Sequence, residues 1–158
     1  MTHEILVNAA IVAVSVIAME WIACASHKYV MHGWGWGWHR SHHEPERSGL
    51  ERNDLYAIVF AAIAITLIAL GNQGVWPLTW VGLGMTIYGF LYFVVHDGLV
   101  HRRWRFRYVP KRGYLKRLVQ AHRLHHAIRT RDSGISFGFL YAAPLARLRD
   151  EFRSKRRS

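Results

Sequence analysis

Ten of the eleven histidines lie in four short motifs that form two similar pairs. HKYVMH is followed by HRSHH, and further along the chain HDGLVH is followed by HRLHH, so the pattern H-x4-H then H-x2-H-H occurs twice. A lone histidine such as His3 is more often a hydrogen-bonded residue than a ligand, but this doubled clustering indicates metal binding, because imidazole is the commonest metal ligand. The candidate ligands, which would act in catalysis through the metals, are His27, His32, His39, His42, His43, His96, His101, His122, His125 and His126.

The spacing H-x2-H-H indicates two metals rather than one. On a helix, positions i, i+3 and i+4 share a face, so each of these motifs can direct three imidazoles to one region. Neighbouring side chains nevertheless point about 100° apart. His42 and His43 therefore more easily serve two metals than one. The spacing predicts a binuclear site.

The spacing H-x4-H predicts a departure from regular helix. Five residues turn an α-helix by about 500°, which leaves the two imidazoles about 140° apart. His27 and His96 both lie where a long apolar run ends. A helix end, a π-bulge or a bend at these places would bring both rings of each pair inward, and we expect an irregular turn there.

Imidazole suits Fe, Zn, Cu and Ni alike, so the ligand type does not select the metal. Closed zinc sites need four ligands each, and ten histidines exceed that number for two sites. The arithmetic favours two five-coordinate metals, each with an open position. Because neutral imidazoles leave the full cationic charge on the metals, an anionic oxygen species could bind between them.

Three acidic residues lie close to these motifs. Glu20 precedes His27 by two helical turns, on the same face and about 10 Å away, so it could orient a ligand or relay a proton, or else snorkel or pair elsewhere. Asp97 could hydrogen-bond the ring of its neighbour His96 or pair with the basic run that follows. Asp54, just before an apolar run, is predicted to be a helix N-cap rather than a catalytic residue.

Three apolar runs, residues 5–25, 55–70 and 75–95, are long enough to cross or nearly cross a membrane. In a soluble protein they would leave too little polar chain to cover them. A cleaved signal peptide is the alternative for the first run, but no Lys or Arg precedes it. We therefore predict an all-α integral membrane protein with one domain over residues 1–158, three transmembrane helices and a His-rich helical cap. The run 135–148 is too short to span, contains Pro144 and is predicted to lie at the membrane interface as a short fourth element.

Charge sets the predicted orientation. The chain has 21 Lys and Arg against 10 Asp and Glu, and 17 of the basic residues follow His101. The positive-inside rule then places the His-rich segments 26–54 and 96–134 on the cytoplasmic side of the membrane, with the N-terminus and the GNQG loop outside. Because membrane spans lie on both sides of the first His motifs, the basic charge is better suited to anionic lipid headgroups or an acidic partner than to nucleic acid, and we predict no nucleic-acid partner. The single Cys excludes a disulfide within one chain.

The segment MHGWGWGWHRSHH links the first two His motifs. Gly33, Gly35 and Gly37 would permit a bend that returns the second motif to the same metals. The three Trp residues between them are predicted to lie in the headgroup belt, with the mouth of the site as the alternative. On the third span, Gly82, Gly84 and Gly89 would allow close helix packing or leave a groove for a slender chain.

The four His motifs together resemble those of the membrane fatty-acid hydroxylase superfamily. Longer strings, among them GWGWHRSHH, ERNDLY, YFVVHDGLVHRRW, RYVPKRGY, QAHRLHHA and SFGFLYAAP, are similar to the bacterial β-carotene hydroxylase branch of that superfamily. The resemblance extends from about Glu20 to Leu148. It implies a non-haem di-iron monooxygenase that uses O2 to hydroxylate C3 of β-ionone rings, forming β-cryptoxanthin and then zeaxanthin from β-carotene. It also implies a reduced ferredoxin-like electron donor.

Other functions share parts of this pattern. Carotenoid ketolases and lipid or sterol hydroxylases have the same His motifs, so the resemblance fixes the superfamily more firmly than the substrate. A His-rich membrane metal transporter is disfavoured because the histidines gather on one side and line no path across the membrane. A bis-His haem cytochrome is disfavoured because ten ligands are too many. Independently of the resemblance, a metal site at the mouth of a membrane helix bundle suits a substrate that is dissolved in the bilayer.

Overall fold

The computed structural model describes residues 1–44, 50–103, 108–132 and 134–156. Within these ranges the chain is helical or irregular and has no strand, which confirms the predicted all-α class. Two of the elements, η1 and η2, are π-helices. The elements in chain order are α1 (Thr2–Ala25), η1 (Ser26–Trp34), α2 (Trp36–His43), α3 (Asp54–Asn72), α4 (Leu78–Tyr92), η2 (Phe93–Val100), α5 (Gly113–His126) and α6 (Leu145–Lys155).

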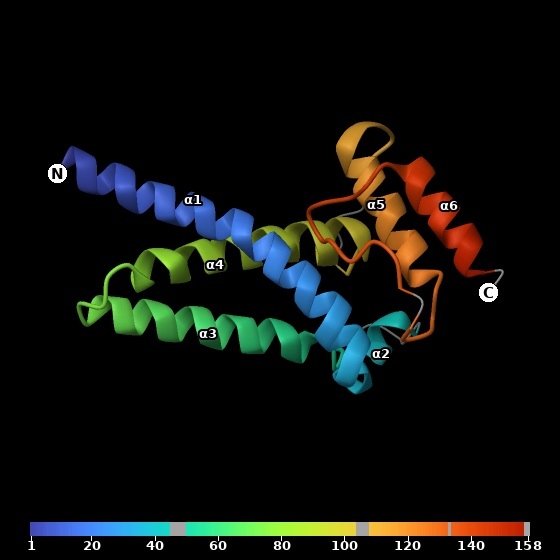
Figure 1. Ribbon diagram of the computed structural model, residues 1–158, viewed down its shortest axis with the longest axis horizontal. Helices are drawn as coiled ribbons and strands as arrows, with labels where there is room; N and C mark the ends of the chain where they lie inside the picture. Colours follow the sequence, from blue (N-terminus) through green and yellow to red (C-terminus); the bar gives the residue numbers. More distant parts are fainter. Residues whose placement is uncertain (45–49, 104–107, 133, 157–158) are drawn as a thin grey trace.

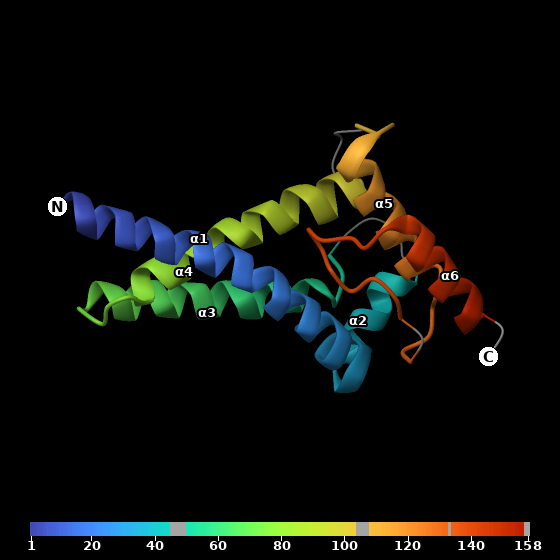
Figure 2. The same ribbon diagram turned by 45° about the horizontal axis from the view of Figure 1, so that its top comes forward.

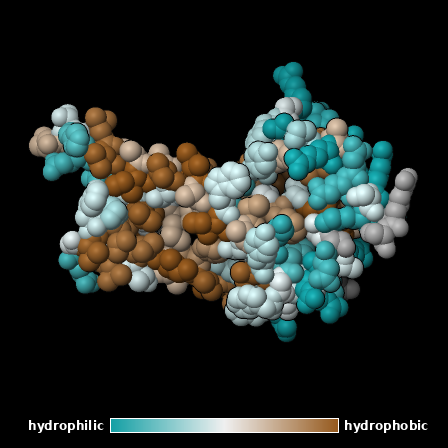
Figure 3. Space-filling model, in the orientation of Figure 1, coloured by the Kyte–Doolittle hydropathy of each residue, from teal (hydrophilic) through white to brown (hydrophobic). Residues whose placement is uncertain are grey.

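Three continuous helices are long and apolar enough to cross a membrane: Thr2–Trp34, Asp54–Asn72 and Leu78–Val100. They correspond to the three predicted spans, although the third begins at Leu78, after the turn that contains Pro77. Large apolar side chains point outward from them, and Leu6 and Trp21 are 68% and 71% exposed. Such an apolar surface suits lipid rather than water, and Figure 3 shows it over the helical bundle, with hydrophilic residues gathered at the other end.

Close helix contacts hold the bundle together at the end that is remote from the histidines. A Cβ at Gly82 would lie 2.8 Å from the carbonyl O of Ala64 on α3, and a Cβ at Gly84 would lie 2.5 Å from Ser15 Cβ on α1. Two of the three glycines singled out on the third span therefore serve helix packing. The N-terminus and the loop between α3 and α4 lie together at this end (Figure 1).

The first H-x4-H motif lies in the π-helix η1, and the second lies in the π-helix η2 up to Val100, with His101 as the C-cap. In η2 the backbone N–H of His101 donates to the carbonyl O of His96 (2.9 Å), and in η1 that of Gly35 donates to Val30 (2.9 Å). An i→i+5 hydrogen bond widens the helix, so residues five positions apart come close to the same face. The predicted irregular turn is confirmed, and it takes the π-helical form.

The polar end of the molecule consists of α2, α5, α6 and an extended segment, residues 134–144, which we call the strap. The strap passes between the apolar bundle and α5 and leads into α6 (Figures 1 and 2). Ile135 is 1% exposed and Phe139 is 7% exposed. Over 135–148 we predicted a short interfacial element; the structure shows the strap and the first turn of α6, while contact of this segment with a membrane stays a prediction.

Candidate metal centre

Nine imidazoles form two clusters, and within each cluster the facing ring nitrogens all lie within 4.8 Å of one another. The tenth, His96, adjoins cluster two, because its Nε2 lies 3.2 Å from that of His42. All ten histidines of the doubled pattern are therefore brought together, and His3 lies outside. Cluster one contains His27, His32, His39, His43 and His125, and cluster two contains His42, His101, His122 and His126.

The two halves of the pattern exchange one histidine. In the first half of the pattern, both histidines of HKYVMH and the first and last histidines of HRSHH belong to cluster one. In the second half, His101 of HDGLVH and the first and last histidines of HRLHH belong to cluster two, which His96 adjoins. The middle histidine crosses over, so that His42 joins cluster two and His125 joins cluster one. Adjacent residues thus serve different clusters, as the 100° turn between neighbouring helical positions requires.

Backbone carbonyls orient four of the imidazoles. Nδ1–H of His27 donates to Phe137 O (2.9 Å) and that of His125 donates to Ile135 O (2.8 Å), both on the strap. Nδ1–H of His32 and of His43 likewise donate to the carbonyl oxygens of Arg131 and Ile128. Because a carbonyl oxygen can only accept, Nδ1 carries the proton and the Nε2 lone pair faces inward.

Side chains orient three more. Asn53 Oδ1 accepts from Nδ1–H of His39 (2.7 Å), and Glu51 Oε2 accepts from that of His42 (2.8 Å). Asp97 Oδ1 accepts from Nδ1–H of His96 (2.8 Å), which is one of the two roles considered for Asp97. Asn53 and Glu51 were not among the candidates; the only signal was that a polar cluster, ERND, directly precedes an apolar run.

The residues fit metal ions on the chemistry of their facing atoms. Nε2 of His27 lies 3.0 Å from Nε2 of His39, and both rings carry their proton on Nδ1. Two bare lone pairs at this distance repel each other unless a cation lies between them. The same arrangement occurs between His32 and His125 (3.3 Å). Nε2 of His126 is buried and has no hydrogen-bond partner in the described part of the chain, which also suits a metal.

Burial keeps these imidazoles neutral. It lowers the pKa of His39 to about 3, with further lowering by the neighbouring His43, and it lowers the pKa of His43 and of His101 to about 4. For His126, burial and the neighbouring His101 lower the pKa to about 2. A neutral imidazole is the form that binds a metal, so the site is ready to take up cations at neutral pH.

A network of charged groups adjoins cluster two. The guanidinium of Arg103 donates two hydrogen bonds to Asp54 (both 2.8 Å). It also lies 3.5 Å from the Asp97 carboxylate, so Asp97 has the second role considered for it, pairing with the basic run, as well as the first. Asp54 was predicted to be an N-cap, but Asn53 occupies that position and Asp54 is the first helical residue. The Asp54 carboxylate instead accepts from Arg103 and from the backbone N–H of Glu51 (2.9 Å). The rest of the basic run, residues 104–107, lies outside the described residues.

Glu20 binds the strap rather than a histidine. Its Oε1 accepts from the backbone N–H groups of Phe139 (2.9 Å) and Tyr141 (2.9 Å), its Oε2 accepts from Leu140 (3.0 Å), and the Tyr88 hydroxyl also donates to Oε2 (2.8 Å). This carboxylate in a membrane-spanning helix is thus fully partnered. It fixes the strap whose carbonyls orient His27 and His125.

The bend in the segment MHGWGWGWHRSHH lies at Gly33 and Gly35. Gly33 has non-helical dihedral angles, and a Cβ at Gly35 would lie 2.9 Å from Val30 O. Gly37 lies inside α2, where a Cβ would meet no atom within 4 Å. The headgroup-belt prediction is wrong for Trp36. Its ring packs on His32 (centroids 5.1 Å apart) and therefore lines the site, which was the alternative. Trp34, 85% exposed, is free to contact lipid.

Taken together, the bundle and the paired clusters define an all-helical membrane protein with a candidate dinuclear centre of imidazole ligands. The fatty acid hydroxylase family model matches residues 12–143, and the chain belongs to this family. Among curated proteins, the β-carotene hydroxylase of Pantoea ananas is 64% identical over 148 residues, which cover 94% of this chain and 85% of that protein.

Two further relatives extend the comparison. The β-carotene hydroxylase of Paracoccus sp. (strain PC1) is 54% identical, over 90% of this chain and 89% of its own length. The chloroplastic β-carotene 3-hydroxylase 1 of Arabidopsis thaliana is 38% identical, over 81% of this chain and 42% of its own length. No solved structure matches this chain.

Proposed function

We propose that the chain is a di-iron, O2-dependent monooxygenase that adds a hydroxyl group at C3 of the β-ionone rings of carotenoids. β-Carotene would become β-cryptoxanthin and then zeaxanthin. The observation that carries the proposal is the convergence of ten imidazoles in two clusters, in a chain that is 64% identical to a β-carotene hydroxylase. In each turnover one atom of O2 enters the C3–H bond, and the other leaves as water with two electrons from the donor and two protons.

The ten histidines would hold the two iron ions. When bound, iron supplies the redox chemistry that hydroxylation of an unactivated C–H bond requires. The acceptors on Nδ1, which are the carbonyls of Phe137 and Ile135 and the side chains of Asn53, Glu51 and Asp97, hold the rings in place and fix their tautomers. Asp97, beside His96, is the protein's candidate for moving a proton to and from the site.

We infer that the protein lies in the bacterial inner membrane with the site on the cytoplasmic side and the N-terminus outside. The basic residues, most of which follow His101, support this orientation. The N-terminus and the α3–α4 loop lie at the opposite end of the bundle from α5 and α6, as the orientation requires (Figure 1). The basic end would contact anionic lipid headgroups and dock an acidic, ferredoxin-like donor.

The direct test replaces one crossing histidine from each half. His42→Ala and His125→Ala, each in a β-carotene-producing host, should bind roughly one metal ion fewer per chain and form at least about 100-fold less zeaxanthin. His3→Ala is the control, since His3 lies outside both clusters. Metal content by elemental analysis and pigments by chromatography are the measurements.

Unchanged metal content and zeaxanthin in both variants would overturn the ligand assignment. Zinc rather than iron in anaerobically purified, active protein would overturn the di-iron part. A ketone at C4 in place of an alcohol at C3 would show a carotenoid ketolase, and an untouched carotene pool would point to another lipid substrate. The products therefore separate the hydroxylase from its alternatives.

A further inference from the structure

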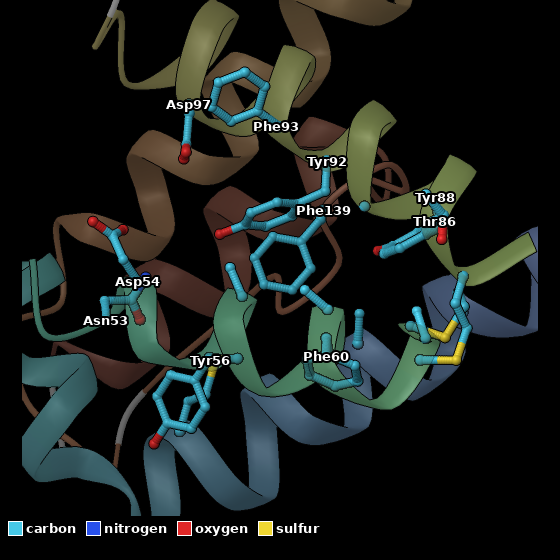
Figure 4. A pocket seen from close by; sticks show the side chains of 18 of the residues that line it. Asn53, Asp54, Tyr56, Phe60, Thr86, Tyr88, Tyr92, Phe93, Asp97 and Phe139 are labelled. Carbon is cyan, nitrogen blue, oxygen red and sulfur yellow. The ribbon is translucent and has the colours of Figure 1, made fainter. Parts of the chain in front are cut away.

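A cavity of about 430 Å³ lies inside the bundle, between α1, α3 and α4 (Figure 4). At one end its lining is apolar, with Ala64 and Ile65 of α3 and Met85 of α4. The other end reaches the polar side chains of Asn53 and Asp97. The volume lies in the range of roughly 300–1,000 Å³ that is typical of small-molecule sites.

The cavity has a mouth on the side of the bundle. Lining residues Ala57, Ala61 and Ile65 recur once per turn along α3, and all three are exposed. Gly89 and Phe93 are exposed lining residues on the facing side. Helices α3 and α4 touch at Gly82 and diverge toward the end of the bundle that carries the histidines, as Figure 2 shows. The mouth thus opens from a membrane-spanning part of the protein, where a lipid-dissolved molecule can enter.

The inner wall of the cavity packs on the metal centre. Tyr92 stacks on the ring of His96 (centroids 4.5 Å apart), and Phe139 stacks on that of His27 (4.8 Å). Asn53 and Asp97, which also line the cavity, accept hydrogen bonds from His39 and His96. A molecule in the cavity is therefore one side chain away from the candidate ligands, at the end where the lining becomes polar.

We propose that this cavity binds one end ring of a carotenoid, which enters between α3 and α4 while the rest of the polyene stays in the lipid; this inference rests on the proposed function. At a packing density of about 0.75, an end ring of nine carbons needs about 200 Å³, and a forty-carbon carotene about 900 Å³. The cavity holds the ring and the first part of the polyene, and no more. The ring edge that carries C3 meets the polar end, where the new hydroxyl group finds hydrogen-bond partners.

One ring per visit has a consequence for the order of reactions. The ring at the far end of the substrate remains outside, so the second hydroxylation requires the monohydroxylated carotenoid to leave, turn and re-enter. β-Cryptoxanthin is then a released product rather than a bound intermediate. An unlabelled β-cryptoxanthin chase should dilute the label that passes from β-carotene into zeaxanthin; undiluted label would overturn release between the two steps.

Two adjacent alanines on α3 give a matched test of the cavity. Ala61 lines the mouth, whereas Ala62 is exposed and lies outside the lining. Ala61→Leu should lower kcat/KM for β-carotene by about tenfold or more in liposomes, and Ala62→Leu should stay within about twofold of the parent. Gly89→Leu should act like Ala61→Leu, because a Cβ at Gly89 meets no atom within 4 Å and leucine is a better helix former.

Metal content, expected to be unchanged in all three variants, shows that the site has folded. Equal activity of Ala61→Leu and Ala62→Leu would overturn the cavity as the ring site, provided that the parent hydroxylates β-carotene. A second readout does not need turnover: β-carotene retained per chain after purification from chelator-treated, carotene-producing cells should fall in Ala61→Leu and in Gly89→Leu but not in Ala62→Leu. If the parent retains β-carotene but forms no hydroxylated carotenoid, the cavity is a carotenoid-binding site and the proposed function is wrong.

Discussion

At the scale of single residues, the centre depends on which ring nitrogen carries the proton. Seven of the ten histidines have an acceptor on Nδ1, four of these acceptors being backbone carbonyls and three being side chains. Each acceptor leaves Nε2 bare and pointing inward. The acceptors therefore decide the ligand geometry as much as the histidines do.

Glu51 gives the clearest test of this dependence. Glu51→Ala removes the acceptor of His42, so the ring can rotate or change tautomer, and we expect metal affinity to fall by about 10- to 100-fold. Glu44→Ala is the control, because Glu44 pairs with exposed Arg40 at the surface and does not contact a candidate ligand. Metal content after dialysis against graded chelator is the measurement. Equal retention in the two variants would contradict an orienting role for Glu51.

The histidines were predictable from the sequence and most of their partners were not. A repeated spacing of one metal-binding residue type is visible in the letters, and the divergence of His42 and His43 follows from helix geometry. A carbonyl acceptor leaves no such trace, because every residue has one. Phe137 and Ile135 orient rings through their backbones, so their side chains gave no sign of that role.

At the scale of elements, two π-helices and one bend direct the rings. The five-residue separation in HKYVMH and HDGLVH fits a widened helix, and this is why an irregular turn could be predicted there. Its π-helical form could not be chosen over a helix end or a kink, because all three bring the rings inward. The bend that follows η1 returns the chain at Gly35, whose carbonyl accepts from the Tyr56 hydroxyl (2.8 Å).

Two glycines in this segment have opposite expected behaviour. A Cβ at Gly35 would clash with the Tyr56 hydroxyl, so Gly35→Ala should push α2 away from α3 and lower both the melting temperature and the metal content. Gly37→Ala adds a methyl group in open space inside α2 and should leave the protein unchanged or stabilise it by about 0.5–1 kcal/mol. Thermal unfolding of the purified holoprotein compares them. If both variants melt alike, the close approach at Gly35 does not hold the bend.

At the scale of the whole molecule, the fold follows from segregation of the chain into apolar and basic parts. Apolar runs of membrane-spanning length predicted the three helices, and the His motifs at the ends of two of them placed the site at one end of the bundle. The strap was not predictable in this way. Its residues form no helix of their own, and two of the residues that hold it, His27 and Glu20, lie 110 to 121 positions away from their strap partners in the sequence.

Glu20 connects the bundle, the strap and the metal centre, so its replacement tests the molecule as a unit. In Glu20→Gln the NH2 group of the side-chain amide cannot accept a hydrogen bond. This leaves a strap N–H or the Tyr88 hydroxyl without an acceptor in an apolar setting. We expect the free energy of unfolding to fall by about 1–3 kcal/mol. Metal content should fall too, because the strap carbonyls orient His27 and His125. Glu4→Gln, at a side chain 78% exposed, should change neither quantity, and equal loss in both variants would show that Glu20 acts only through the charge of the chain.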